Sequence, residues 1–566
     1  MMERALAIAW KDLLILGKTV SPWRGFVGTT LVLAPLLALA ALQVYSPGPW
    51  RYAGAASALA TAALFSALAF VVAVPAATSL ALERDRDTLP SLVVSPARPN
   101  DLIFGKLLAA LATALATKAV ALPALAFAYA LGGIDAGFIP RYLAVLAAAD
   151  LSFGSFALYA SARPLRIGRL GAAGLGRLGV SQAQLAAQRS VGVVVLMSLV
   201  PIYSTLLAVP LALQHGVHLG RDIEAFAPLG ALHPLLALVA WGEARIYGVS
   251  VPVWVLAISF HVLLAVPLVA SAAEAQRAAF APRGRAPRLG FLLLFAFVAL
   301  VATGGAWEAP DVVHALAGPL AASALLIVGA TAFAQAPPPR RPFGRRDVLL
   351  GFVDPRRALA SSAESAPGFA FLLAVVAAPF FFLVAPKLAA ARAALGVALA
   401  AVGIASIGAR LAARLQRKDA EALAKALASR ESGPGERAER EEPSSEGTTA
   451  LGTALGLAAV FVIVSPLLAF SGTELARRIP QLDPLVPFFQ GVGAFGIIAN
   501  PFTALEPLTA GMLAGPSVAV AGAEPGTLSA LHIAFWGLVV LVSLATLRRP
   551  AATARALIGS GSAGAS

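Results

Sequence analysis

Cysteine is absent from the 566-residue sequence, and only 13% of the residues are charged. The absence of cysteine excludes disulfides, thiolate catalysis and cysteine-ligated metal sites. The charged fraction is about half that of soluble globular proteins, whereas 59% of the residues are hydrophobic. Because so much apolar surface cannot be hidden from water, a soluble enzyme, a disordered regulator and a fibrous protein are all excluded. A mean hydropathy of +0.81 predicts instead a polytopic helical membrane protein.

Acidic residues are also scarce, since 29 Asp and Glu stand against 43 Lys and Arg and the net charge is +14. In a soluble chain this excess would suggest nucleic-acid binding. In a membrane protein the simpler interpretation is that basic residues gather in cytoplasmic loops and set the topology. We therefore expect no nucleic-acid partner.

Apolar runs long enough to cross a bilayer, about 17 residues or more, predict an all-α fold with about twelve transmembrane helices. Two runs enter only when this criterion is relaxed. The predicted spans are 26–45, 55–82, 107–131, 142–162, 191–213, 251–273, 289–306, 312–334, 369–385, 393–408, 450–470 and 528–547.

The distribution of basic residues predicts the orientation of these spans. With the N-terminus inside, 34 of the 43 Lys and Arg residues lie in cytoplasmic segments and eight lie in outer segments. Such a bias follows the positive-inside rule. Both termini are therefore expected in the cytoplasm, and the chain is expected to be a multi-pass protein of the cell membrane, plasma or inner.

The order of spans and loops predicts four regions. They are an amphipathic cytoplasmic interfacial helix at 1–25, a six-span unit at 26–280, a second six-span unit at 281–550 with a charged cytoplasmic loop at 409–449, and a flexible tail at 551–566. In the first region one helical face is typical of a helix on a membrane surface, and its members are Leu6, Trp10, Leu13, Leu14 and Gly17. In the charged loop, residues 410–430 have helical spacing.

A weak internal repeat favours the six-plus-six division. The hexapeptide that begins at His233 resembles the one that begins at Asn500, and His261 and His532 each lie 16 residues before an arginine. Chance similarity in an Ala- and Leu-rich chain is the alternative. Each hexapeptide lies in a Pro-containing outer stretch, 225–242 or 484–505, which we interpret as re-entrant, although a spanning segment remains open.

The most informative segment follows the second predicted span and reads ERDRDTLPSLVVSPARPNDLIFGK from Glu83 to Lys106. A charged helix just below the bilayer, held by a span on either side, offers polar contacts to a soluble partner, and Pro90 and Pro96 break helices. The alternative is an ordinary solvated loop with topogenic charges. The ordered continuation through Ser95-Pro96 to Gly105-Lys106 favours a docking helix.

This segment resembles the permease subunits of ABC transporters of the ABC-2, type V exporter-like class. The family has a charged run after its second span, then a Ser/Thr-Pro turn and a Gly-Lys that opens the third span. Asp87 replaces the family's glycine, and Pro90 stands where an acidic residue is common. The matching positions are Glu83, Arg84, Asp85, Arg86, Thr88, Ser95, Pro96, Gly105 and Lys106. An N-terminal surface helix and re-entrant outer helices are also family features, and the resemblance covers about residues 1–280.

The resemblance implies that residues 83–98, which end at Arg98, form a coupling helix for an ABC ATPase. The chain has no phosphate-binding loop of its own, since Gly17-Lys18-Thr19 lacks the required first glycine, which would stand at Asp12. We therefore expect no enzymatic activity and no cofactor on this chain. ATP and magnesium would bind a separate ATPase subunit, two copies of which would dock beneath one chain or beneath a homodimer.

Two ionisable residues interrupt the third and fourth spans. Lys118 lies about 18 Å above Lys106, and Asp150 lies about 20 Å above Arg163, at 1.5 Å per helical residue. Because a lone charge at that depth is costly, we predict a Lys118–Asp150 ion pair between these spans. The pair is either a structural contact that fixes helix register or part of a proton-coupled transport path.

Other polar residues suggest weaker hypotheses. His261 and His532 are expected to be hydrogen-bonded bundle residues. His215 and His218, followed by Asp222 and Glu224, have loose metal-ligand spacing without a convincing third ligand, and we predict no metal site. The acid-free loop that contains Arg163, Arg166, Arg169, Arg177 and Arg189 is expected to contact anionic membrane lipids, with ATPase contact as the alternative.

Three functions therefore compete. The first is the permease subunit of an ABC exporter, with 83–98 as the coupling segment. The second is a secondary transporter driven by protons or sodium through Lys118 and Asp150. The third is a membrane-embedded enzyme for lipid-linked substrates, which we rank last because the outer loops offer only scattered candidates: Asp222, Glu224, Glu243 and Asp483.

Overall fold

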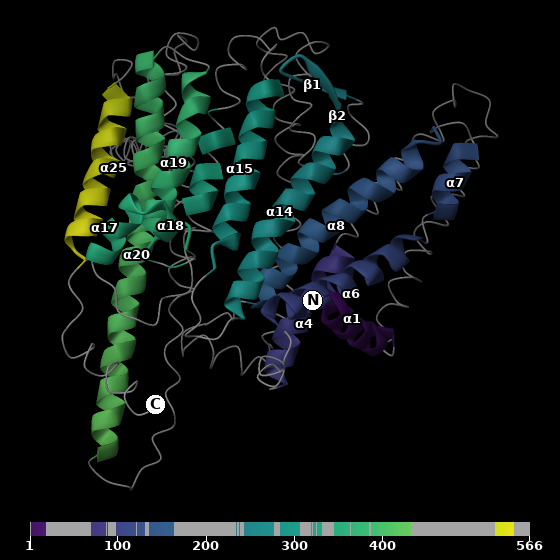
Figure 1. Ribbon diagram of the computed structural model, residues 1–566, viewed down its shortest axis with the longest axis horizontal. Coiled ribbons are helices and arrows are strands. Elements are labelled where there is room, and N and C mark those ends of the chain that lie inside the picture. The colour runs from purple at the N-terminus through teal and green to yellow at the C-terminus, as the bar shows by residue number, and fades with distance from the viewer. Residues whose placement is uncertain are drawn as a thin grey trace, which may run out of the picture. The chain divides into compact units, whose positions relative to one another are not determined.

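The chain is largely helical in the computed structural model (Figure 1). The structure describes residues 2–17, 70–86, 88, 98–119, 122–130, 135–162, 234, 237, 243–276, 284–305, 319, 321–323, 325–330, 345–360, 362, 364–383, 387–431 and 527–547. Among these residues, five helices are long and apolar enough to cross a membrane, which supports the membrane class that the composition predicts. They are Pro99–Ala116, Phe138–Ala162, Val253–Ala275, Ala286–Gly305 and Leu388–Arg410. The predicted spans 26–45, 191–213 and 450–470 lie outside the described residues.

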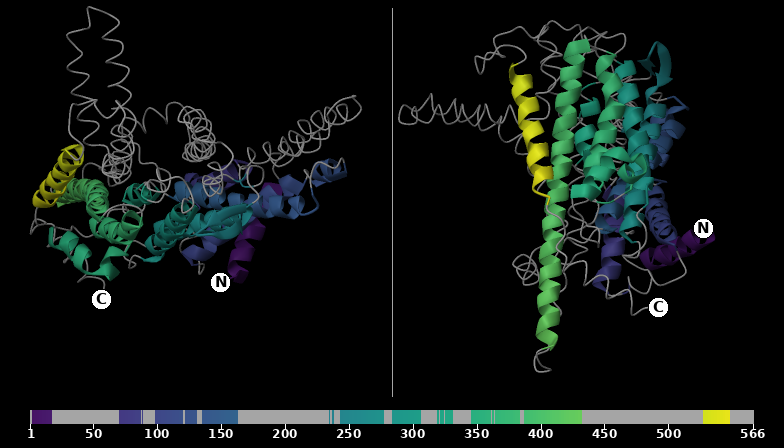
Figure 2. Two further views of the ribbon diagram at one scale, coloured as in Figure 1. Left: turned by 90° about the horizontal axis from the view of Figure 1, so that it is seen from above. Right: turned by 60° about the vertical axis from the view of Figure 1, so that its left-hand side comes forward.

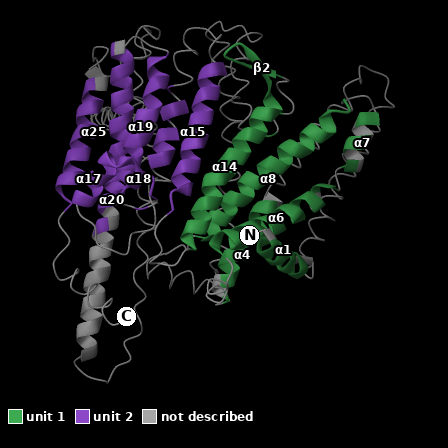
Figure 3. Ribbon diagram, in the orientation of Figure 1, with its two compact units in different colours: residues 1–165, 173–278, 307–309 green, residues 166–172, 279–306, 310–566 purple. Residues whose placement is uncertain are grey.

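The chain divides into two compact units, coloured separately in Figure 3. Unit 1 comprises residues 1–165, 173–278 and 307–309, and unit 2 comprises residues 166–172, 279–306 and 310–566. One division falls between Ala278 and Ala279, and the boundary at 280/281 between two six-span units stays a prediction.

Unit 1 is a helical bundle built around α8. Its described elements are α1 (Met2–Gly17), α4 (Phe70–Asp85), α6 (Pro99–Ala119), α7 (Leu122–Ala130), α8 (Phe138–Ala162), β1 (Glu243–Ile246), β2 (Val249–Pro252) and α14 (Val253–Ala275). Helix α8 packs against α4, α6 and α14, and α1 packs against α6. Gly154 permits this crowding, because a Cβ there would lie 3.0 Å from the Leu107 side chain and 3.1 Å from that of Val72.

Four helix termini of unit 1 meet at one end of the bundle, which we call the α1 end. The Ser161 hydroxyl accepts a hydrogen bond from the backbone N–H of Ala81 (3.0 Å), and the Gln276 amide donates to the carbonyl of Ala162 (3.2 Å). Helices α4, α8 and α14 therefore end together. Helix α6 begins at the same end, where its second turn contacts α1.

One expectation for unit 1 is wrong in detail. The predicted third span, 107–131, contains most of α6 and all of α7, and residues 120–121 and 131 lie outside the described residues. The fold is not purely helical, because β1 and β2 form an antiparallel hairpin. Its turn is Tyr247-Gly248, with φ of 50° and 77°. Two positive φ values are typical of the tight turns whose twist matches that of paired strands.

Unit 2 consists of a second group of packed helices. Its described elements are α15 (Ala286–Gly305), α17 (Arg345–Val353), α18 (Pro355–Ala358), α19 (Ala366–Phe382), α20 (Lys387–Glu431) and α25 (Thr527–Ala545). Helix α20 packs between α19 and α25. Its contact with α25 is close because Gly403 faces the Trp536 ring, from which a Cβ would be only 2.6 Å away.

Helix α20 is much longer than the predicted span 393–408. It has 45 residues, of which Leu388–Arg410 are apolar enough to cross a membrane. The helix then continues through residues 411–431, as the helical spacing of 410–430 predicts, and extends past α19 and α25 (Figure 2). The first prediction was too short because it stopped at the first charged residue, whereas the backbone hydrogen bonds of a helix continue across an apolar-to-polar boundary.

Candidate functional site

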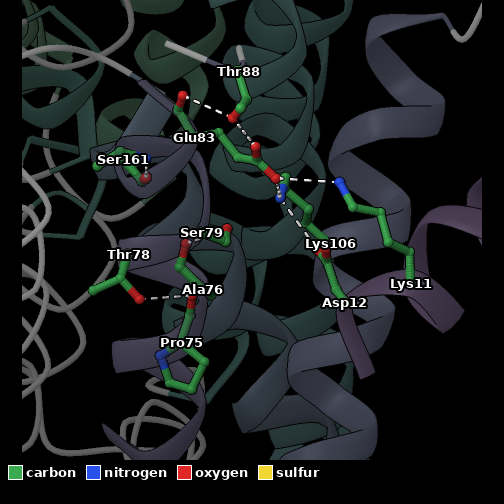
Figure 4. Close-up of polar contacts among 11 residues, drawn as sticks. Lys11, Asp12, Pro75, Ala76, Thr78, Ser79, Glu83, Thr88, Lys106 and Ser161 are labelled. Carbon is green, nitrogen blue, oxygen red and sulfur yellow. Dashed lines mark hydrogen bonds and ion pairs between the residues drawn. The ribbon is translucent and has the colours of Figure 1, made fainter. Parts of the chain in front are cut away.

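Among the described residues of unit 1, charged side chains of three helices meet at the junction of α1, α4 and α6 at the α1 end (Figure 4). Its centre is Lys106, whose side chain is only 2% exposed. The Lys106 Nζ lies 3.2 Å from Asp12 Oδ2 of α1 and 3.6 Å from Glu83 Oε1 of α4. A buried ammonium group needs such partners, because loss of its hydration is compensated only by close opposite charges. One lysine therefore links three helices, and we call this group the Lys106 junction.

The carboxylate of Glu83 is held from several sides. The Lys11 Nζ lies 3.5 Å from Glu83 Oε1, and the Thr88 hydroxyl donates to the other carboxylate oxygen. The backbone N–H of Thr88 also donates to the Glu83 carbonyl at 2.9 Å. This bond turns the chain immediately after α4 and satisfies a carbonyl of its last turn. The start of the predicted coupling segment is thereby tied to the Lys106 junction.

The ion pairs also change the acidity of Glu83, which lies beyond the apolar residues of its helix. Burial by itself would raise the pKa of this carboxyl. The hydrogen bond from Thr88 and the charges of Lys106 and Lys11 outweigh burial, so that the pKa lies below its ordinary value of 4.5. Glu83 is therefore ionised at neutral pH, as the junction requires.

Gly105 brings α1 into backbone contact with α6. A Cβ at this position would lie 2.7 Å from the carbonyl oxygen of Ala5 and 2.7 Å from the Cβ of Ile8, closer than non-bonded atoms approach. Ala5 and Ala9 are buried on the same side of α1. The other side exposes Leu6, Trp10 and Leu14, as its spacing predicts, and Trp10 is 65% exposed. This amphipathic pattern is typical of a membrane-surface helix.

The remaining predicted coupling residues lie at the end of α4, before α6 or outside the described residues. Arg84 and Asp85 end α4, Arg86 is exposed, and Ser95 and Pro96 lie outside the described residues. Arg98 is also exposed and precedes α6, where its backbone N–H donates to Asp101 Oδ2 at 3.2 Å. An acidic residue at the third helical position that reaches back in this way forms half of a capping box. The coupling segment therefore ends at a defined helix start.

The structure also brings together Lys118 of α6 and Asp150 of α8. Both side chains are buried, and the Lys118 ammonium contacts Asp150 Oδ2. Tyr142 is buried on α8, two turns before Asp150. Because α6 and α8 pack side by side, the pair joins the two helices well inside unit 1.

The predicted bundle histidines occupy buried positions. His261 of α14 lies with its Nδ1 2.9 Å from the hydroxyl of Ser152 of α8, and the Phe153 ring lies edge-on to it. His532 of α25 is buried beside the Trp536 ring. His261 thus belongs to the α8–α14 interface, in agreement with its expected hydrogen-bonded role.

Sequence reasoning missed a buried arginine in unit 2. Arg288, in the first turn of α15, is fully buried and donates to the carbonyls of Ala358 (2.7 Å) and Ser362 (2.8 Å) and to the Ser365 hydroxyl (2.6 Å). Its guanidinium also lies 4.9 Å from the centre of the Phe369 ring. We call this group the Arg288 clamp. The sequence signal is weak, because an arginine before an apolar run usually serves only as a topogenic charge.

Asp12 and Lys11 were also missed as members of the Lys106 junction. The sequence places both charges on an amphipathic helix before the first span, which could have marked them as candidates. Sequence spacing does not reveal which other helix they contact. Among the described residues, no group of three or more His, Asp or Glu is arranged to hold a metal ion. His215, His218, Asp222 and Glu224 lie outside these residues, as does the loop 163–190.

Comparison with known proteins identifies no relative of the chain. No protein-family model, curated protein or solved structure matches the chain.

Proposed function

We propose that the protein is the permease subunit of an ABC transporter, an exporter of the ABC-2 class, with twelve transmembrane helices and both termini in the cytoplasm. The observation that carries the proposal is the Lys106 junction. It connects the surface helix α1, the end of α4 and the start of α6 through one buried ammonium group. A force applied to the segment after α4 would therefore reach both α1 and a membrane-spanning helix.

The placement of helix ends supports this orientation. In unit 1, α4, α8 and α14 end at the α1 end, and α6 begins there. The predicted topology assigns each of these termini to the cytoplasmic side, where the segments are rich in basic residues. The coupling segment 83–98 would then face the cytoplasm, where an ABC ATPase would bind it.

In this proposal the chain is a transport subunit and not an enzyme. Two copies of a separate ABC ATPase supply ATP hydrolysis with magnesium, and membrane lipids surround the helices. One chain forms the pathway if unit 2 is a second permease unit, and a homodimer forms it otherwise. Closure of the ATPases would pull on residues 83–98, and the Lys106 junction would pass this movement to α6.

The test is co-purification of the tagged protein with the ABC ATPase encoded beside it. We expect a stable complex, and we expect the double variant Arg84→Glu/Arg86→Glu to lose ATPase bound through unit 1. A matched control is Lys387→Glu/Arg392→Glu, which reverses two charges in a predicted outer segment and should leave the complex intact. A well-folded sample that binds no ATPase would overturn the proposal.

The Lys118–Asp150 contact favours a second candidate, a transporter driven by a proton or sodium gradient. A buried ion pair between two packed helices can change its charge state as the helices move. In proteoliposomes without ATPase, a proton gradient or a sodium gradient, each applied separately, would then change the intrinsic fluorescence of the parent but not that of Lys118→Met/Asp150→Leu. Identical traces for both proteins would exclude this candidate.

A further inference from the structure

Unit 1 holds a second group of buried polar side chains, about 18 Å along α6 from the Lys106 junction at 1.5 Å per residue. It consists of Lys118 of α6 with Asp150 and Tyr142 of α8, and we call it the Lys118 group. The exposed fractions of these residues are 4%, 0% and 1%. Tyr142 precedes Asp150 by a little over two helical turns, so both lie on the same side of α8. The Asp150 carboxylate also interacts electrostatically with the Tyr142 hydroxyl.

Two atoms of the Lys118 group have no hydrogen-bond partner within the part of the chain that the structure describes. They are Asp150 Oδ1 and the Tyr142 hydroxyl. The Lys118 ammonium contacts Asp150 Oδ2, and a lysine ammonium has three hydrogens to donate. Most buried polar side-chain atoms in proteins have a partner, so each exception calls for an explanation. A bound ligand would supply the hydrogen bonds that these atoms require.

The charges and hydrogen-bonding capacities of the Lys118 group indicate the chemistry of that ligand. Lys118 and Asp150 together carry no net charge, so a charged ligand would add an unpaired charge inside a membrane-spanning bundle, which is costly. Asp150 Oδ1 requires a donor, Lys118 donates, and Tyr142 can do both. A hydroxyl group donates and accepts in a small volume, whereas an ester oxygen only accepts and would leave Asp150 unsatisfied. The ligand is therefore neutral and carries hydroxyl groups.

The surroundings of Lys118 favour a ligand from the bilayer. Helix α6 is apolar enough to cross a membrane over Pro99–Ala116. Leu115, one turn before Lys118, is 44% exposed, and Ala119 directly after it is also exposed. Because residues three apart are neighbours on a helix surface, Lys118 borders a face that contacts lipid. Pro123 also interrupts the predicted third span just beyond Lys118, and interrupted helices line ligand sites near the middle of the membrane in transporters.

We propose that the Lys118 group is a binding site for a neutral lipid with free hydroxyl groups. A lipid hydroxyl donates to Asp150 Oδ1 and accepts from Tyr142, and the acyl chain lies along the exposed apolar face of α6. Asp150 Oδ2 keeps its contact with Lys118, so the ion pair stays intact when the lipid is bound. This inference goes beyond the proposed function, because such a site requires neither an ATPase nor an ion gradient.

The test measures binding of 1-monoolein to the full chain in lauryldimethylamine oxide, a detergent without hydroxyl groups that could compete. Native mass spectrometry at increasing lipid concentration gives the apparent Kd from the fraction of protein that carries the lipid. Methyl oleate keeps the acyl chain without the hydroxyls, and glycerol keeps the hydroxyls without the chain. We expect methyl oleate to bind at least about tenfold more weakly than monoolein, because it leaves the buried carboxylate oxygen without a donor. Glycerol should not displace monoolein.

Three variants locate the bound lipid. Tyr142→Phe removes one hydroxyl and keeps the ring that stacks on Phe138, with ring centroids 5.9 Å apart. We expect it to bind monoolein about three- to tenfold more weakly, which corresponds to the loss of one hydrogen bond. Lys118→Met/Asp150→Leu should bind monoolein and methyl oleate equally. The matched control Tyr159→Phe, on the same helix, should bind monoolein as the parent does, and melting temperatures of the lipid-free proteins show whether each variant folds.

Three results would overturn the inference. The first is an unchanged affinity for monoolein in a folded Tyr142→Phe variant. The second is equal affinity of the parent for monoolein and methyl oleate, which would show that the protein binds the acyl chain alone. The third is displacement of monoolein by glycerol, which would identify a site for soluble polyols. None of these measurements involves the ATPase, so the proposed function is tested separately by co-purification.

Discussion

The two units bury cationic side chains in different ways. In unit 1, Lys106 and Lys118 contact carboxylates on neighbouring helices, whereas in unit 2 the Arg288 guanidinium donates to two backbone carbonyls and one hydroxyl. Each unit also holds a short helix against a glycine, at Gly105 for α1 and at Gly368 for α17. Similar glycine contacts between helices are therefore combined with different polar partners for the buried cations in the two units. Carboxylates gain and lose protons and can exchange partners, whereas carbonyl acceptors have a single charge state.

The largest expected effect comes from breaking the Arg288 clamp. Arg288→Met removes this donor from the buried carbonyls of Ala358 and Ser362. Because Ser365 Oγ still lies 3.0 Å from the Ser362 carbonyl oxygen, the cost of an unsatisfied buried acceptor, about 1–3 kcal/mol, is expected mainly at Ala358. Scanning fluorimetry of the detergent-solubilised protein should show a clearly lower melting temperature. Arg288→Lys keeps the charge without the planar fork and should fall between the variant and the parent. An unchanged melting temperature in Arg288→Met would mean that the clamp does not stabilise unit 2.

In unit 1, removal of one partner of the buried Lys118–Asp150 pair should lower the stability, and removal of both partners should restore most of it. Lys118→Met leaves Asp150 buried without its counter-charge, and breaking such a pair costs up to about 3–5 kcal/mol. The double variant Lys118→Met/Asp150→Leu should recover most of this loss, because an apolar pair of similar volume replaces both charges. Urea unfolding of the parent, of Lys118→Met, of Asp150→Leu and of the double variant gives the coupling energy. A double variant as unstable as Lys118→Met would show that the pair does not act as a unit.

The next largest loss of stability is expected at the glycine contact between α1 and α6 in unit 1. Gly105→Val adds side-chain atoms where α1 and α6 already touch, and such overpacking typically costs about 1–3 kcal/mol. We expect α1 to separate from α6, which increases the rate at which a protease cleaves near residue 17. The matched control is Gly537→Val on α25, since a Cβ there meets no atom within 4 Å. Equal cleavage rates in both variants would contradict the close contact.

The smallest expected effect is a difference in pH response between the units. The pKa of Glu83 is lowered, so its ionic contacts stabilise the fold above about pH 4.5, and this contribution is lost as the pH falls through the lowered pKa. Burial and the nearby Asp347 raise the pKa of Glu364 above 4.5, so ionisation of Glu364 destabilises the fold as the pH rises through that pKa. Glu83→Gln should therefore be less stable than the parent at neutral pH, and Glu364→Gln more stable.

Melting temperatures of both variants and the parent from about pH 3 to pH 8 test this contrast, because the scan must pass below the ordinary carboxyl pKa of 4.5. The deficit of Glu83→Gln should shrink toward acidic pH, and the advantage of Glu364→Gln should also shrink there. If melting temperature depended on pH in the same way in all three proteins, the ionisation of Glu83 and Glu364 would not distinguish the two units.

The helical class and the depth match of Lys118 and Asp150 were accessible from the sequence. Both depend on rules that are local or one-dimensional: apolar run length, and 1.5 Å of rise per residue. The spacing of Leu6, Trp10 and Leu14 likewise gave the exposed face of α1. In these cases the environment of each residue follows from its own segment.

The missed features depend on contacts between segments far apart in the chain. Arg288 is bound by residues about 70 positions later, and Asp12 contacts a lysine 94 residues away. The hairpin at Tyr247-Gly248 was missed for another reason, since one turn with two positive φ values interrupts a chain whose composition otherwise favours helix. Spacing alone does not identify partners across such separations.

The length of α20 has a practical consequence for imaging. A membrane protein of only 57.6 kDa is difficult to align in single-particle electron microscopy. Residues 411–431 continue α20 beyond its apolar part by about 30 Å at 1.5 Å per residue. A helical fusion partner joined in register near Glu431 would therefore project at a fixed angle and serve as a fiducial marker for particle orientation.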